Sequence, residues 1–256
     1  MNDKSEASLS HWLAQIEQVC TSLNIFTVSV IVDQAGDVPS LVQDLLRFKP
    51  EIDWVSLLEN EPENEFIDDA PLFLQLRIDI WQHKEWLAAL LRQYHDPARI
   101  LLFFSHSDYG LLARHLQGLT TAEWEGRKGM MRYYDTRIFP FLVDAILIKW
   151  QKEYFLGIAK FWSWRDRDGQ PVWLSGGEQE YDFSEPAMIT LTDAQYSQLG
   201  IISDIERFVS HHYYKYPEYT RESLFDHLWH VLQNASAKNI VDNERFLIDY
   251  MTKAEA

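Results

Sequence analysis

Hydrophobic positions in the first two thirds of the chain alternate between helical and strand-like spacing. Leu9, Trp12 and Ile16 follow one another at three or four positions, which predicts an amphipathic helix over residues 6–23. Short apolar and β-branched runs predict buried strands, and the run at 72–78 indicates cover on both of its faces. The expected strands are 26–32, 54–58, 72–78 and 100–104, and the expected helices between and after them are 41–46, 81–94 and 111–118.

Beyond residue 120 the pattern predicts one strand, one helix and one hairpin. Residues 130–134 have the composition of a strand. The apolar stripe from Phe139 to Tyr154 predicts a helix that begins at Phe139 or at Pro140. Residues 161–164 and 172–174 flank Asp168-Gly169, which is typical of a hairpin with a loop longer than two residues. These elements predict a mixed α+β domain over residues 1–185, with a central sheet flanked by helices.

The last quarter of the chain has helical periodicity only. Thr192 and Gln195 have capping-box spacing and open one helix, and Thr220 caps a second. A third helix is expected between Ile240 and Met251. Residues 186–256 are therefore predicted to form a small all-helical lobe.

Charge and composition narrow the functional classes. The 256 residues include 23 Lys and Arg against 39 Asp and Glu, so the formal net charge is −16. Such acidity disfavours nucleic acids and anionic membrane surfaces as partners. Cys20 is the single cysteine, which excludes an internal disulfide and a cysteine-based zinc cluster. No signal-like start and no apolar run of spanning length is present, so a cytoplasmic location is expected.

The sequence offers little catalytic chemistry. It has neither of the glycine-rich nucleotide motifs, no G-x-S-x-G elbow and no H-E-x-x-H helix. Ser105, His106 and Asp108 are hydrolase residue types, but consecutive residues on one turn cannot converge as a triad. Ser and Asp at such a turn more commonly bind backbone amides.

Other candidate groups have ordinary structural interpretations. His227 and His230 have metal-ligand spacing with Asp226 near them, yet no third ligand lies close in sequence. The acidic stretch 59–65 indicates a solvated loop, and Asp166 and Asp168 belong to the hairpin turn. The tryptophans of the hairpin are more typical of packing against neighbouring side chains than of a sugar-binding platform. Those tryptophans are Trp162, Trp164 and Trp173. We therefore expect no metal, no cofactor and no enzymatic activity.

The segment from residue 211 to residue 219 is unusually rich in aromatic and imidazole rings. Tyrosine supplies a large, stiff and amphipathic contact area, which suits protein interfaces. The alternative is that these rings cover the junction between the two predicted domains. The candidate partner-binding residues are His211, His212, Tyr213, Tyr214, Tyr216 and Tyr219.

Residues 126–137 concentrate paired charge beside aromatic residues. Arg132 and Asp135 are within reach of each other across a strand-to-helix turn, and Arg137 adds a second guanidinium. The arrangement is compatible with an anion site, but a fixed Arg–Asp pair that orients the turn is favoured. Arg132, Tyr134, Asp135 and Arg137 are thus candidate structural or partner-binding residues.

The same segment resembles a known family. Residues 132–142, Arg-Tyr-Tyr-Asp-Thr-Arg-Ile-Phe-Pro-Phe-Leu, are similar to the R-[FY]-[YF]-D-P-R-V-L-P-x-L core of the type VI secretion effector adaptors, also catalogued as domain of unknown function 4123. Further pieces follow in the family's order: strands at 26–35 and 70–74, the strand and helix at 100–119, and Phe155-Leu156-Gly157. The resemblance covers residues 25–175, with Thr136 in place of the usual proline.

The resemblance implies a binding protein. Such adaptors, or effector chaperones, act in the cytoplasm of Gram-negative bacteria, where they hold a cognate toxic effector and load it onto the VgrG spike. The expected partners are therefore an effector and the spike protein. The alternatives are an enzyme with a site outside known motifs, such as a hydrolase or a sugar-active protein, and an immunity or structural protein.

Overall fold

The computed structural model describes residues 3–36, 39–59, 61–94, 97–177, 187–235 and 242–254. The chain divides into two compact units, Met1–Thr190 and Leu191–Ala256. The boundary predicted at 185/186 lies outside the described residues. None of the helices within the described ranges is long and apolar enough to cross a membrane.

The first unit is built on a six-stranded antiparallel sheet in the order β2-β3-β1-β4-β7-β8. The prediction of a mixed α+β domain with a central sheet and flanking helices is confirmed. The strands are β1 (Thr27–Val32), β2 (Asp53–Ser56), β3 (Leu72–Arg77), β4 (Ile100–Phe104), β7 (Phe161–Arg165) and β8 (Pro171–Ser175). β1 and β4 lie at the centre, which explains their nearly continuous burial.

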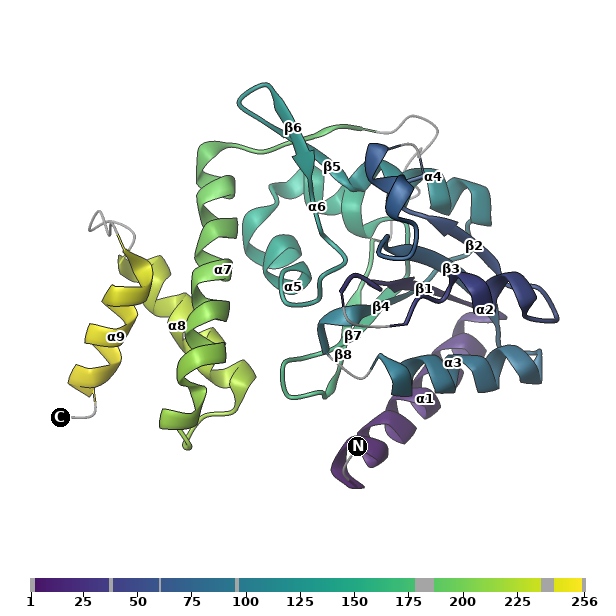
Figure 1. The fold of residues 1–256 in the computed structure, drawn as a ribbon, viewed down its shortest axis with the longest axis horizontal. Coiled ribbons are helices and arrows are strands. Elements are labelled where there is room, and N and C mark those ends of the chain that lie inside the picture. The colour runs from purple at the N-terminus through teal and green to yellow at the C-terminus, as the bar shows by residue number, and fades with distance from the viewer. Residues whose placement is uncertain are drawn as a thin grey trace. The chain divides into compact units, whose positions relative to one another are not determined.

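One face of this sheet is covered by the first three helices. They are α1 (Asp3–Leu23), α2 (Val42–Arg47) and α3 (Trp81–Gln93), and Figure 1 shows α1 and α3 close together. Alternate residues of the strands, such as Val30, Leu74 and Leu102, form a single core with Leu9, Trp12 and Ile16 of α1. The amphipathic stripe predicted for residues 6–23 therefore points at the sheet.

The intervening strand residues form a second, aromatic core. The ring of Phe103 lies 5.7 Å from that of Phe73 and 4.9 Å from that of Trp162, and Phe139 lies 5.2 Å from Trp162. The helices on this side are α4 (Tyr109–Leu119), the short α5 (Phe139–Phe141) and α6 (Lys149–Leu156). Both faces of the central strands are buried, as predicted for 72–78.

The strand predicted at 130–134 is wrong. Instead, β5 (Thr121–Trp124) and β6 (Arg127–Met130) form a hairpin, and β9 (Ile189–Thr190) completes a small sheet in the order β6-β5-β9. Trp124 pairs with Arg127 across Glu125 and Gly126, whose φ values of 49° and 73° are those of a two-residue primed turn. This turn fixes the register, in which Met130 pairs with Thr121, the first residue of β5. β6 ends there, and residues 131–135 are not part of a strand.

The single helix expected over 139–154 is interrupted. After α5, residues Leu142–Ile146 form one π turn (η3), in which Leu147 N donates to Leu142 O at 2.9 Å. Leu147 and Ile148 are then extended, and the Gln151 side chain accepts from Ile148 N at 3.1 Å as α6 begins. The apolar stripe crosses the break, so its spacing alone does not show it.

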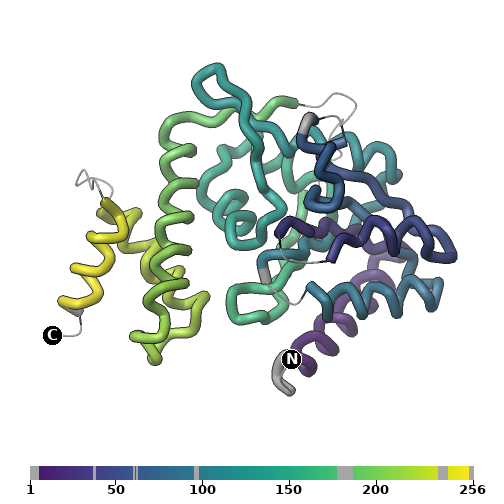
Figure 2. The backbone as a smooth tube through the Cα atoms, in the orientation of Figure 1, coloured from purple at the N-terminus to yellow at the C-terminus, as the bar shows by residue number. Residues whose placement is uncertain are grey.

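The second unit consists of α7 (Asp193–His212), α8 (Arg221–Ala235) and α9 (Asn243–Ala254), with a 3₁₀ turn η4 (Tyr213–Lys215) after α7. The backbone trace shows α8 and α9 beside α7 (Figure 2). Thr192 Oγ1 accepts from Gln195 N at 3.3 Å, and the Gln195 side chain accepts from Thr192 N at 3.0 Å. The predicted capping box and the predicted all-helical C-terminal region are confirmed.

Candidate functional site

The segment Met131–Arg137 leaves the β5–β6 hairpin and crosses back to the large sheet. Two consecutive tyrosines anchor it in the aromatic core. Tyr133 is fully buried, its ring lies 5.1 Å from that of Phe155, and its hydroxyl donates to Leu116 O at 3.1 Å. Tyr134 is also buried. The two buried rings therefore fix the backbone from which Arg132 and Asp135 extend.

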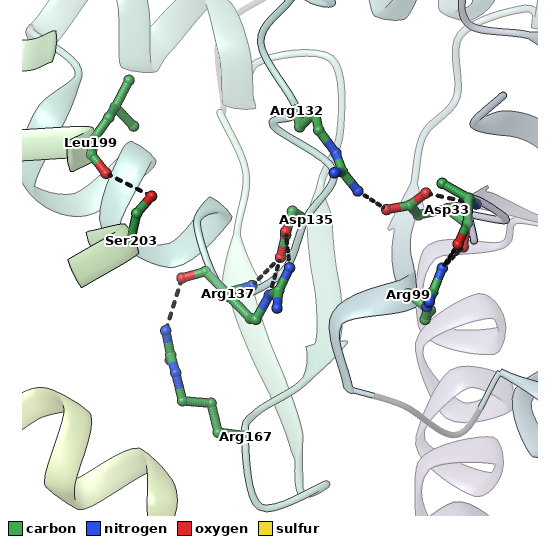
Figure 3. A network of polar contacts seen from close by, with 9 residues as sticks. Asp33, Arg99, Arg132, Asp135, Arg137, Arg167, Leu199 and Ser203 are labelled. Atoms are coloured by element: carbon green, nitrogen blue, oxygen red, sulfur yellow. Dashed lines mark hydrogen bonds and ion pairs between the residues drawn. The ribbon is translucent and has the colours of Figure 1, made fainter. Parts of the chain in front are cut away.

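Arg132 forms an ion pair with Asp33 at the end of β1, with 2.5 Å between Arg132 Nη2 and Asp33 Oδ2 (Figure 3). Asp33 is nearly buried, whereas the Arg132 side chain is about half exposed. The other carboxylate oxygen of Asp33 accepts from Ala35 N at 3.1 Å, and Arg99 donates to the backbone oxygens of Asp33 and Ala35. The predicted pair of Arg132 with Asp135 is therefore wrong, because the partner of Arg132 is Asp33.

Asp135 pairs instead with Arg137, two residues further along. Its carboxylate accepts from Arg137 Nε at 3.0 Å, from Arg137 Nη2 at 2.7 Å and from the Arg137 backbone N at 3.0 Å. The Asp135 backbone oxygen accepts from Phe139 N as α5 begins. Arg167, from the β7–β8 loop, donates to Arg137 O at 2.9 Å (Figure 3). A fixed Arg–Asp pair does orient this turn, but with Arg137.

A groove opens beside Arg132, between the connection from β2 to β3 and the segment that follows β6. Its volume is about 300 Å³, and an adjoining hollow of about 160 Å³ shares Leu58, Glu63 and Met130 with it. Buried residues form the floor, and Phe66 and Met130 are exposed at the rim. The lining residues are Ala35, Leu58, Glu63, Phe66, Asp69, Ala70, Pro71, Met130, Arg132 and Tyr134.

Both walls of the groove are tied to the loop that follows β1. Asp33 holds Arg132 on one wall. The buried side chain of Gln34 donates to Ile67 O at 2.8 Å on the other wall and accepts from Leu41 N at 2.9 Å. Gly36 N donates to Asp69 Oδ1 at 3.2 Å. Residues 33–36 therefore set the separation of the two walls before any partner binds.

Burial controls the ionisation of the groove's polar groups. Burial raises the pKa of Tyr134, and the nearby charge of Asp33 raises it further, so the phenol stays neutral. Burial alone would lower the pKa of Arg132, but the charge and hydrogen bond of Asp33 outweigh it and raise that pKa. The guanidinium carbon of Arg132 lies 6.0 Å from the centre of the Tyr134 ring.

A comparison with family models bears on this part of the chain. Residues 28–151 match the family described as Domain of unknown function (DUF4123). The match agrees with the domain family named from the sequence, over a shorter span than residues 25–175. It includes Asp33, Arg132, Asp135, Arg137 and both walls of the groove. No curated protein and no solved structure matches the chain.

Asp33 is the residue of this site whose role sequence reasoning missed. It lies 99 positions from Arg132, so spacing could not pair them. A signal was present, because Asp33 ends a strongly apolar strand and falls within the DUF4123 match. A carboxylate in that position needs a cationic or hydrogen-bonding partner when the strand is central.

The Tyr/His segment lies outside the DUF4123 match, in the second unit, and its rings have different environments. Tyr216 is 5% exposed and stacks on Phe208 of α7 at 6.1 Å, whereas Tyr214 is 76% exposed. His212 lies 4.8 Å from Phe208. Arg221 lies 5.3 Å from the centre of the Tyr213 ring, and Tyr219 lies 5.6 Å from His227. Tyr216 is thus part of the unit's core, and Tyr214 is available for contact.

The remaining candidates have structural contacts. His227 lies between Tyr219 and Tyr250, and His230 Nδ1 is 2.7 Å from Asp226 O. Across the described ranges, no group of three or more His, Cys, Asp or Glu side chains is placed to hold a metal ion. At the turn before α4, Ser105 Oγ accepts from Ser107 N and Asp108 caps Leu111 N, as the structural interpretation predicted.

The hairpin tryptophans and acidic residues also pack or bind backbone groups. Trp162 contacts Phe103 and Phe139, and Trp173 stacks on Phe104 at 5.6 Å. Asp166 accepts from the backbone N of Asp168 and of Gln170, which closes the β7–β8 loop.

Proposed function

We propose that this protein is a type VI secretion adaptor that binds a cognate effector in the cytoplasm and loads it onto the VgrG spike. The observation that carries the proposal is the DUF4123 match over residues 28–151, which contains the Arg-Tyr-Tyr-Asp-Thr-Arg core of the resemblance to the effector adaptors. The two arginine–carboxylate pairs and the groove lie within it. The net charge of −16 supports a partner with basic or apolar contact surfaces over a nucleic acid or an anionic membrane.

The proposal assigns binding, and no catalysis, to the chain. A carrier needs preformed surfaces that hold a partner without changing it, and a groove with a fixed wall separation meets that need. The helical unit is proposed as the surface that distinguishes one effector from another, since it lies outside the family match and presents Tyr214.

Co-purification tests the proposed function directly. The tagged full-length protein is co-expressed with the spike and effector candidates encoded beside its gene. We expect it to retain an effector candidate through size-exclusion chromatography and to increase the amount that associates with the spike. Purified protein that captures neither candidate, or that turns over a peptide, ester or glycoside substrate, would overturn the proposal.

A metal assay tests the expectation that no metal is required. Elemental analysis of the purified protein should show less than stoichiometric metal. The double variant His227→Ala/His230→Ala should have the same metal content as the wild type. Stoichiometric metal that disappears in this double variant would contradict it.

A further inference from the structure

We propose that the groove between the β2–β3 connection and Met130–Tyr134 binds an extended segment of a partner protein that carries Lys or Arg beside a large apolar side chain. The inference deepens the proposed function and rests on it only in taking the partner to be a protein. The chemistry of such a segment follows from the residues that line the groove and its adjoining hollow.

The acidic wall supplies the charge selectivity. From residue 59 to residue 69 the sequence has six carboxylates and no Lys or Arg: Glu59, Glu61, Glu63, Glu65, Asp68 and Asp69. Glu59 accepts from Gln117, Asp68 from Ser40 and Asp69 from Gly36. Among the residues that the structure describes, Glu61, Glu63 and Glu65 form no ion pair. These exposed carboxylates remain available to a basic partner.

The opposite wall does not neutralise this charge. Arg132 lines the groove but is engaged with Asp33 at 2.5 Å, and Lys128 lines the adjoining hollow together with Glu61 and Glu63. Glu61, Glu63 and Asp69 line the groove or its adjoining hollow and outnumber Lys128, so the field there attracts cations and repels phosphates. A basic protein segment fits this charge pattern, whereas a nucleic acid does not.

The apolar part of the groove supplies the second requirement. Phe66 is 68% exposed and Met130 is 48% exposed, and they lie over a floor of Leu58, Ala70 and Pro71. Aromatic and methionine side chains are enriched at protein-binding surfaces. A volume of about 300 Å³ accommodates one large apolar side chain, and the adjoining 160 Å³ continues the surface past Glu61 and Glu63.

The walls need little rearrangement to accept a segment. Asp33 binds Arg132 on one wall, and Gln34 and Gly36 bind Ile67 and Asp69 on the other. Gln34 is fully buried. A preformed groove loses less conformational entropy on binding than one that must be ordered by its ligand.

The test uses fluorescence anisotropy with the full-length protein and three labelled probes of about ten residues. One probe carries Lys and Arg beside Leu and Phe, a second replaces its apolar residues by Ser, and a third replaces its basic residues by Glu. We expect saturable binding of the first probe and at least about tenfold weaker binding of the other two.

Matched variants locate the binding site. Glu63→Lys should weaken binding of the first probe by about tenfold, and Phe66→Ala should do the same. Glu85→Lys on α3 makes an identical charge change at another exposed position, and Leu46→Ala on α2 truncates another exposed apolar residue. Both controls should remain within about twofold of wild type, and all four variants should keep the wild-type melting temperature because the positions are exposed.

The outcomes separate this inference from the proposed function. An absence of saturable binding, or an equal loss in Glu63→Lys and Glu85→Lys, would overturn the groove assignment even if an effector co-purifies. Groove-specific probe binding without any co-purifying effector would support the groove assignment and overturn the adaptor function alone.

Discussion

At the scale of single residues, both arginine–carboxylate pairs join a half-exposed guanidinium to a buried carboxylate. The side chains of Asp33 and Asp135 are 6% and 4% exposed, against 45% for Arg132 and 46% for Arg137. Most of the energetic value therefore lies in the hydrogen bonds that satisfy the buried oxygens, and less in the screened ion pair.

Asp135→Ala tests the structural role of the motif. The change removes three acceptor contacts to Arg137 and leaves its backbone N–H in a largely buried turn. We expect a loss of about 2 kcal/mol in the free energy of unfolding, because the exposed half of Arg137 can rehydrate. Urea denaturation measures it. Asp135→Asn keeps an acceptor oxygen, so its free energy of unfolding should fall by less than that of Asp135→Ala.

A different result would reassign the motif. If Asp135→Ala unfolds like wild type while capture of the effector disappears, Asp135 and Arg137 belong to an interface and not to the framework of the turn.

His115 on α4 predicts a dependence of stability on pH. Burial lowers its pKa to about 4, and its ring lies 4.7 Å from that of Tyr154. Between pH 6.5 and pH 4 the unfolded chain binds a proton at this histidine and the folded chain does not, so stability falls as the pH falls. This histidine should lower the free energy of unfolding by on the order of 3 kcal/mol, and most of that loss should be reached by about pH 4.

The measurement compares urea unfolding of wild type and His115→Leu at pH 7.5 and pH 4.5. The wild-type protein should lose more stability across this range than the variant, while His106→Gln at an exposed position should follow wild type. Equal losses in wild type and His115→Leu would show that other groups control the acid sensitivity.

At the scale of elements, the segment after β8 is fixed because its backbone approaches the backbone of the loop after α6 closely. Gly176 N donates to Lys160 O at 2.8 Å, and Gly177 N donates to Leu156 O at 3.2 Å. A Cβ on Gly176 would lie 1.7 Å from the backbone oxygen of Ala159, and one on Gly177 would lie 2.7 Å from Gly157 Cα. This contact connects the end of the hairpin to the loop that follows α6.

Gly176→Ala should consequently be disruptive. We expect a loss of about 3 kcal/mol or more, since a backbone oxygen cannot move aside as a flexible side chain does. Gly129→Ala in β6 is the matched control, because a Cβ there meets nothing within 4 Å. Thermal unfolding of both proteins checks the prediction, and similar melting temperatures for the two would refute the close approach.

At the scale of the whole molecule, the chain separates a sheet-based unit that contains the family match from a helical unit outside it. In the proposed function, the first unit carries the features common to the family, and the helical unit distinguishes one effector from another. The segment 211–219 contributes both to the core of the helical unit and to its surface, so its rings are predicted to respond differently to substitution.

Two tyrosine variants separate these roles. Tyr214→Ala should weaken effector capture by about tenfold without changing the melting temperature, since this ring is mostly exposed. Tyr216→Ala should cost about 3 kcal/mol of stability, because it empties a buried position against Phe208. Unchanged capture by Tyr214→Ala would indicate that the effector binds elsewhere on the protein.

Local physical preferences made much of the fold predictable. The apolar periodicity identified α1, the central strands and the helical C-terminal region, and side-chain capping identified the start of α7 at Thr192. These features depend on residues within a few positions of one another, so they can be predicted from the sequence without knowledge of the fold. The Arg-Tyr-Tyr-Asp-Thr-Arg segment was also recognisable, because its residues are contiguous.

Tertiary structure decided the features that join distant parts of the chain. It ended β6 at Met130, interrupted the helix after Ile146 and paired Arg132 with Asp33 across 99 positions. The fold also placed Glu61 and Glu63, which belong to the acidic stretch 59–65 that was expected to be a solvated loop, in the lining of a groove and its adjoining hollow. Such outcomes depend on which surfaces meet when the sheet is covered on both faces, and long-range packing overrides local spacing there. The types of residues were therefore readable in the sequence, whereas their partners were set by the fold.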